Sequence, residues 1–181
     1  IGTPVRIAST GDLLRNPRLL KTETGYALAW IGRDYMTNQL MFVLLDSEGN
    51  PLGTPQSLAS GNIGFSKMVR FGNKSVLAFG AIQSYEIGFE NSLLFLDADG
   101  SPSGDLVILE GNYNAFFSGE ASIGLLAKDN ELLVAWSSSK DNWEDSNAAT
   151  TLRIERYNAE KNRVSPVYNL QSPVENKENI H

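Results

Sequence analysis

The sequence predicts an all-β fold built from repeated antiparallel sheets. Short apolar runs alternate with polar turns that carry glycine, asparagine and proline, which is typical of strands joined by tight turns. No stretch shows helical periodicity with a cap at each end. A unit of four such strands occurs three times at a spacing of about 50 residues, and this periodicity indicates a tandem array of sheets.

The first complete unit occupies residues 10–60. Its turns contain Glu-Thr-Gly and Asp-Ser-Glu-Gly-Asn-Pro, whose glycine, asparagine and proline suit hairpin connections. The apolar runs on either side of these turns predict four strands, at residues 17–20, 26–30, 39–45 and 54–59.

The second unit, residues 61–110, repeats the first closely. Val-Leu-Ala-Phe at residues 76–79 corresponds to Ala-Leu-Ala-Trp at residues 27–30, and the turn that begins at Asp97 corresponds to the one that begins at Asp46. The aromatic residue that ends the second strand holds one position in every unit, so we expect it to pack between sheets. These aromatic residues are Trp30, Phe79 and Trp136.

The third unit, residues 111–170, is looser than the other two. Extra residues lie before it, at 111–118, and inside it, at 137–149. Residues 171–181 are polar and show no apolar pattern, so we expect a tail or linker there. The strands predicted for this unit are residues 125–127, 132–136, 151–157 and 166–170.

The first nine residues resemble the fourth strand of the first unit. Gly-Thr-Pro, two variable residues, an aliphatic residue and Ala-Ser occur both in residues 1–9 and in residues 53–60. Because residues 53–60 close a four-stranded sheet, we expect residues 1–9 to be the outer strand of an incomplete sheet. The other three strands of that sheet would come from elsewhere.

A tandem series of four-stranded antiparallel sheets is typical of a β-propeller, in which each sheet is one blade. The predicted fold is therefore three blades, at residues 10–60, 61–110 and 111–170, plus one N-terminal outer strand. Closed propellers use four to eight blades, and open ends leave apolar faces in water. We therefore expect the chain to complete a larger ring with other polypeptide chains.

The repeat length fits kelch-like propellers better than the shorter WD repeats, although the dipeptides typical of both are absent. The aromatic-ended second strand, the apolar third strand and the Asp-x-acid-Gly-x-Pro turn resemble the propeller repeats of secreted and surface proteins of bacteria. This resemblance implies an extracytoplasmic location, which means secreted, periplasmic or on the cell surface.

Composition and charge exclude several classes of function. A formal net charge of −6 at pH 7 argues against nucleic acid as a partner. No apolar run approaches the roughly 20 residues of a membrane-spanning helix, so membrane insertion is not expected. The chain has no cysteine and its one histidine is His181, which excludes thiolate metal sites, histidine metal sites and a Ser-His-Asp triad.

Aromatic residues alternate with carboxylates in the loops predicted between second and third strands, and aromatics with amides in one connection between blades. Such loops on a rigid scaffold suit a glycan or a protein ligand. Solvation alone also explains polar loops, because long surface loops are polar in most proteins. The candidate ligand-binding residues are Asp34, Tyr35, Tyr85, Glu86, Tyr113, Asp141, Trp143 and Glu144.

One turn of the second unit has the composition of a weak calcium site. Asp97, Asp99 and Asp105 alternate as carboxylate ligands do, but the distal glutamate of an EF-hand is missing. The same turn in the other units begins at Asp46 and Asn158, which favours an ordinary hairpin turn. Ca²⁺ is therefore a weak candidate, and no other cofactor is expected.

The function favoured by the sequence is a non-catalytic binding or assembly module. The alternative is a fragment of a propeller glycoside hydrolase or lyase. In that case carboxylates would converge on the ring axis and act as the acid and as the nucleophile or base. The Ser-x-Asp-x-Gly-x-Thr-Trp box of sialidase-type propellers is absent, which weighs against catalysis. The carboxylates that this alternative requires are Asp34, Glu86, Asp141 and Glu144.

Overall fold

The all-β prediction is confirmed. The computed structural model describes residues 4–7, 14–34, 37–84, 88–109, 123–139, 150–164 and 168–171, and these contain strands and no helix. No helix in this part of the chain is long and apolar enough to cross a membrane. The strands are β1 (Arg15–Lys21), β2 (Tyr26–Asp34), β3 (Thr37–Leu45), β4 (Gln56–Phe71), β5 (Lys74–Ser84), β6 (Gly88–Leu96), β7 (Val107–Ile108), β8 (Ile123–Lys128), β9 (Glu131–Ser139), β10 (Thr150–Tyr157) and β11 (Tyr168–Gln171).

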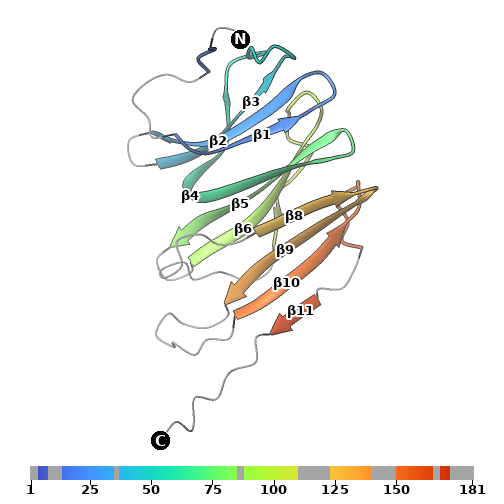
Figure 1. Cartoon of the computed structure of the whole chain (residues 1–181). Coiled ribbons are helices and arrows are strands. Elements are labelled where there is room, and N and C mark those ends of the chain that lie inside the picture. The colour runs from blue at the N-terminus through green and yellow to red at the C-terminus, as the bar shows by residue number, and fades with distance from the viewer. Residues whose placement is uncertain are drawn as a thin grey trace, which may run out of the picture.

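The strands pair as one seven-stranded antiparallel sheet, β1 to β7, and one four-stranded antiparallel sheet, β8 to β11. Because the pairing changes within β4, we describe them as three sheets stacked in chain order (Figure 1). Sheet A contains β1, β2, β3 and the first part of β4. Sheet B contains the second part of β4 with β5, β6 and β7. Sheet C contains β8, β9, β10 and β11. Within the described residues the sheets do not close into a ring, so the propeller stays a prediction.

Strand β4 belongs to two sheets. Its residue Gly61 pairs with Asn38 of β3, and the next residue, Asn62, pairs with Ile82 of β5. Gly61 has a φ of 138°, and register shifts occur on both sides of it, between Leu40 and Met41 and within β4 itself. Bulges and a flexible residue let a strand bend from one sheet into the next. The fourth strand predicted for the first unit, residues 54–59, therefore continues into the first strand of sheet B without a break.

The turn after the third strand is the same in all three sheets. Asp46, Asp97 and Asn158 each donate a backbone N–H to the carbonyl four residues on, at 2.9, 2.9 and 3.0 Å. Each also accepts a backbone N–H from the residue three positions on, and that residue has a positive φ in every case. The repeat read from the sequence is therefore a repeat of backbone geometry. The three positive-φ residues are Gly49, Gly100 and Lys161.

Side chains alternate between the two faces of each sheet. In β5, Leu77 and Phe79 enter the core shared with sheet A, whereas Val76 and Ala78 enter the core shared with sheet C. In β9, Trp136 is fully buried in the core shared with sheet B. We call the face that carries the aromatic residue the leading face, because it covers the preceding sheet, and the opposite face the trailing face.

The two described ends of the stack differ from its interior. On the leading face of sheet A, Trp30 and Val43 are buried in a small cluster of their own, against which Ile7 packs. Residues 4–7 form no ladder with any of the three sheets. On the trailing face of sheet C no described element covers the strands. These two faces are where the candidate site lies.

Candidate functional site

The loop residues predicted to bind a ligand lie outside the described part of the chain, with one exception. Asp34 ends β2 and pairs with Thr37 across the hairpin, but its side chain is not among those described. The structure therefore tests neither a ligand site on these loops nor the convergence of carboxylates needed for a glycosidase. The residues outside the description are Tyr35, Tyr85, Glu86, Tyr113, Asp141, Trp143 and Glu144.

The weak calcium candidates make hydrogen bonds within the turn. Asp97 accepts a short hydrogen bond from Nζ of Lys74, and this bond lowers the pKa of the Asp97 carboxyl. Asp99 accepts hydrogen bonds from the Ser101 hydroxyl at 2.6 Å and the Ser101 amide at 2.9 Å, which lower its pKa in turn. These contacts favour the hairpin-turn interpretation of both residues. The third candidate, Asp105, is exposed after the turn.

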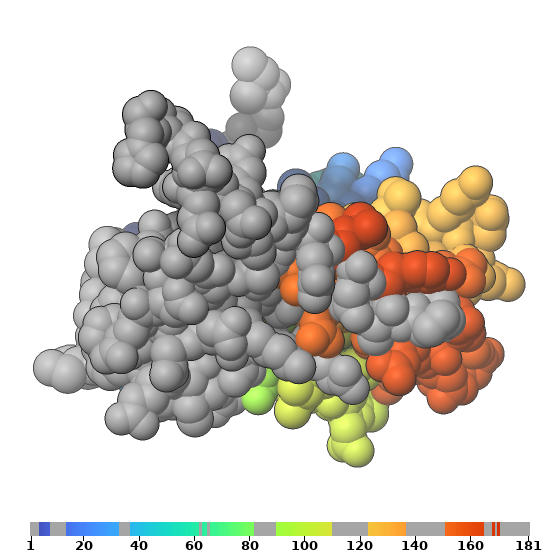
Figure 2. Space-filling view, turned by 90° about the horizontal axis from the view of Figure 1, so that it is seen from below, coloured from blue at the N-terminus to red at the C-terminus, as the bar shows by residue number. Residues whose placement is uncertain are grey.

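The trailing face of sheet C is apolar and open. Leu126, Leu152 and Leu170 are 59%, 41% and 58% exposed. Strand pairing puts them on one side: Leu126 lies opposite Leu133, and Leu152 lies opposite Leu170. Figure 2 looks from this end of the stack, and the orange and red atoms of sheet C lie at the surface.

The same positions are covered in the other two sheets. Ala135 of β9 corresponds to Ala78 and Ala29, and both of these are 0% exposed because the following sheet packs over them. Leu170 corresponds to Leu109, which is 2% exposed in the core between sheets B and C. The exposed side chains of sheet C are therefore of the kind that this fold normally buries under another sheet.

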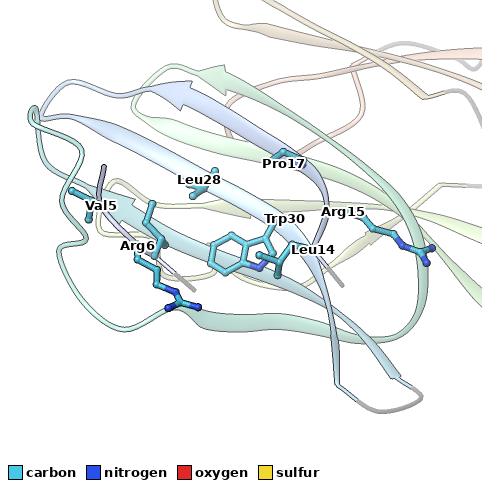
Figure 3. Close-up of a pocket in the computed structure, with 8 residues that line it drawn as sticks. Val5, Arg6, Leu14, Arg15, Pro17, Leu28 and Trp30 are labelled. Carbon is cyan, nitrogen blue, oxygen red and sulfur yellow. The ribbon is translucent and has the colours of Figure 1, made fainter. Parts of the chain in front are cut away.

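The leading face of sheet A is partly open. A pocket of about 360 Å³ lies between Trp30, Leu28 and the N-terminal segment. Figure 3 shows the guanidinium groups of Arg6 and Arg15 directed away from Trp30, so the pocket presents mainly hydrocarbon. Its full lining is Val5, Arg6, Ile7, Leu14, Arg15, Pro17, Leu28 and Trp30.

Comparison with known proteins adds no family. A scan against protein-family models finds no match to the chain, and a search of curated proteins finds no related sequence. The interpretation of the site therefore rests on the chain's own internal repeat.

Sequence reasoning did not identify the two end faces residue by residue. The signal was present, because aligning the units shows that Leu170 and Ala135 occupy positions of Leu109 and Ala78. The alignment does not show that no described strand covers the trailing face of sheet C; that requires the three-dimensional arrangement.

Proposed function

We propose that this chain is a non-catalytic assembly module of an extracytoplasmic β-propeller, and that it completes the ring with sheets contributed by other polypeptide chains. The proposal rests on the open trailing face of sheet C. At this face, side chains that correspond to buried residues of sheets A and B are exposed to solvent.

The energetics favour a cover over this face. Burying a leucine side chain contributes roughly 1.5–3 kcal/mol before the costs of association, and three leucines are exposed here. An antiparallel sheet that faces water usually alternates apolar and polar residues so that its wet face is polar. Sheet C departs from this pattern, because leucine, tyrosine and alanine occupy most of its wet face and the charged Lys128, Glu131 and Arg156 lie near the β8–β9 hairpin at one end. The surface is therefore suited to contact with another sheet.

The proposal also includes a glycan or a protein as ligand of the loops. It draws this from the loop composition, because the residues concerned lie outside the described part of the chain. No observation on the described residues favours the hydrolase or lyase alternative.

The test compares the purified chain with a variant in which Leu152→Lys and Leu170→Lys are combined. We expect the unmodified chain to bind an apolar fluorescent dye and to associate with rising concentration in sedimentation velocity. The double variant should lose both properties and sediment near its monomer mass of 19.8 kDa. Leu106→Lys is the matched control, because Leu106 is exposed just before β7 of sheet B and its substitution should change neither property. An unmodified chain that stays monomeric and binds no dye would contradict the proposal.

A further inference from the structure

Four residues hold one position in the repeat. The amides of Leu52, Ser103 and Val164 donate to the carbonyls of Leu44, Phe95 and Arg156 at 2.9, 2.7 and 2.9 Å, which fixes the alignment of the three sheets. Leu58, Leu109 and Leu170 follow these three amides by the same number of residues. They therefore occupy one equivalent position at the outer strand of each sheet. The Gly-Thr-Pro match adds a fourth member from the N-terminal segment. The four residues are Ile7, Leu58, Leu109 and Leu170.

Each interior member packs against the sheet that follows its own. Leu58 belongs to sheet A and packs into the core with Phe79 of sheet B. Leu109 closes sheet B and is buried in the core with Trp136 of sheet C. Ile7 packs in the same way into the cluster with Trp30 of sheet A. Residues 4–7 therefore lie where the outer strand of a sheet preceding sheet A would lie.

No described strand lies with residues 4–7 on the leading face of sheet A. Leu19 is 62% exposed, whereas its counterpart in sheet B, Met68, packs into the core under sheet A. Leu28 is half-buried and lines the pocket, whereas its counterpart, Leu77, is 0% exposed. In sheet B, the leading face is covered by β1, β2 and β3 of sheet A. In sheet A, the pocket and the exposed Leu19 lie at the equivalent place on the leading face.

We infer that residues 4–7 are a donated strand. They form the fourth strand of a sheet whose first three strands belong to a polypeptide segment outside residues 1–181, and those strands cover Leu19, Leu28 and Trp30. This inference rests on the proposed function and identifies the partner at one end of the stack. Addition of an extended strand to a sheet edge is a common mode of polypeptide recognition, with backbone hydrogen bonds supplying affinity.

A second copy of this chain does not fit this face. The open trailing face of a second copy belongs to its sheet C. That sheet already has an outer strand, β11, and Leu170 occupies there the repeat position that Ile7 occupies in the N-terminal segment. Ile7 already occupies that position against Trp30. The partner sheet must therefore lack its fourth strand.

The repeat also predicts the chemistry of the partner. In sheets B and C the aromatic residue packs in one core with small side chains from the second strand of the preceding sheet. These are Ala27 and Ala29 in sheet A, and Val76 and Ala78 in sheet B. The partner's second strand should therefore carry alanine or valine at two alternate positions. A larger side chain there would collide with Trp30, because packed cores tolerate little added volume.

The register predicts which residue of the partner meets Val5. Val5 corresponds to Gln56, which pairs with Phe42, and to Val107, which pairs with Leu93. A photoreactive benzoyl-phenylalanine at position 5 should therefore react with the third strand of a repeat unit, at the residue equivalent to Phe42. The full chain would be expressed in the organism that encodes it, irradiated, and the adduct sequenced by mass spectrometry.

Two variants sharpen this experiment. Leu19→Glu places a charge on the covered face and should reduce the adduct at least tenfold, whereas Leu106→Glu, an exposed leucine of sheet B, should leave it unchanged. The same photoreactive residue at the exposed Asn73 measures background. Circular dichroism of each variant verifies that the fold is retained.

An adduct on the third strand of a repeat unit outside residues 1–181, lost in Leu19→Glu, supports the inference. A yield no higher than at position 73, an adduct with a second copy, or an adduct with a protein that lacks this repeat overturns it. If the dye and sedimentation results at Leu152 and Leu170 hold while position 5 gives no adduct, the proposed function stands and only the donated strand is wrong.

Discussion

A Cβ atom placed on Gly100 would lie 2.8 Å from Cε1 of Phe42. Gly100 is in the turn after the third strand of sheet B, and Phe42 lies on the trailing face of sheet A, so this turn rests on the aromatic ring of the preceding sheet. Gly49 holds the same position in sheet A with a similar φ, 89° against 83°, but no described atom lies within 4 Å of its Cβ position. The two glycines share a backbone conformation and differ in packing.

Alanine at these two glycines should therefore separate strain from packing. Gly49→Ala should lower the free energy of unfolding by about 1 kcal/mol, because only the left-handed backbone is strained. Gly100→Ala should lower it by about 2–4 kcal/mol, because the new methyl group also displaces Phe42. Urea denaturation of both variants measures the difference. Equal losses would mean that the contact between the turn and Phe42 does not contribute.

A second pair of turns allows a stabilising substitution. Asp129 has a φ of 54° in the turn between β8 and β9, and Gly72 has a φ of 61° at the same place between β4 and β5. Asp129→Gly should raise the free energy of unfolding by about 0.5–1 kcal/mol, because glycine adopts a positive φ without steric cost. Gly72→Ala should lower it by about 1 kcal/mol in the same assay. A destabilised Asp129→Gly variant would contradict this reading of the turn.

The sequence predicts the strands and turns well because both depend on local chemistry. The Asp-x-acid-Gly-x-Pro pattern predicts the hairpins at Asp46 and Asp97, which have matching backbone hydrogen bonds. The sequence does not predict that the strand runs without a break through the boundary between residues 60 and 61. In the fold, pairing with β3 and then β5 keeps the segment extended.

The candidate site is predicted less well, because burial depends on neighbouring sheets. In β10 the alternation of Leu152 and Ile154 with Glu155 and Tyr157 predicts a strand, but hydrophobicity alone favours the leucine and isoleucine as the inward face. The structure has the opposite arrangement, with Glu155 and Tyr157 buried and Leu152 exposed. An apolar residue that a further polypeptide would cover cannot be distinguished from a core residue by its sequence.

The ion pair of Lys74 and Asp97 predicts an acid-dependent loss of stability. The pKa of Asp97 is lowered from its ordinary value of 3.8, chiefly by the hydrogen bond from Lys74, so the folded state favours the carboxylate. Its contribution is therefore complete above pH 3.8 and is lost as the pH falls through the lowered folded-state pKa. Asp97→Asn should make the melting temperature less sensitive to pH below 4, by no more than a few degrees, because the pair is partly exposed.

Thermal melts between pH 2 and pH 7 test this prediction. Lys74→Gln should produce the same flattening, and combining it with Asp97→Asn should add little, because either change removes the same interaction. Asp46, whose pKa is lowered mainly by Asn50, keeps its own acid dependence in all three variants. An unchanged pH profile in Asp97→Asn would show that the pair does not contribute to stability.

The buried Glu155 lies between sheets B and C and accepts hydrogen bonds that should contribute to stability. Glu155 is 2% exposed, and its oxygens accept a short hydrogen bond from the Tyr157 hydroxyl and one of 3.2 Å from Nη1 of Arg163. Tyr157→Phe removes one donor and should lower the free energy of unfolding by about 1–3 kcal/mol, because a buried carboxyl oxygen loses a hydrogen-bond partner. In a Glu155→Leu background the same change should cost less than about 0.5 kcal/mol, since no carboxylate is left to satisfy. Urea denaturation of the four proteins measures the coupling energy, with the exposed Tyr168→Phe as control. Equal costs of Tyr157→Phe in both backgrounds would show that the Tyr157 hydroxyl contributes to stability independently of Glu155.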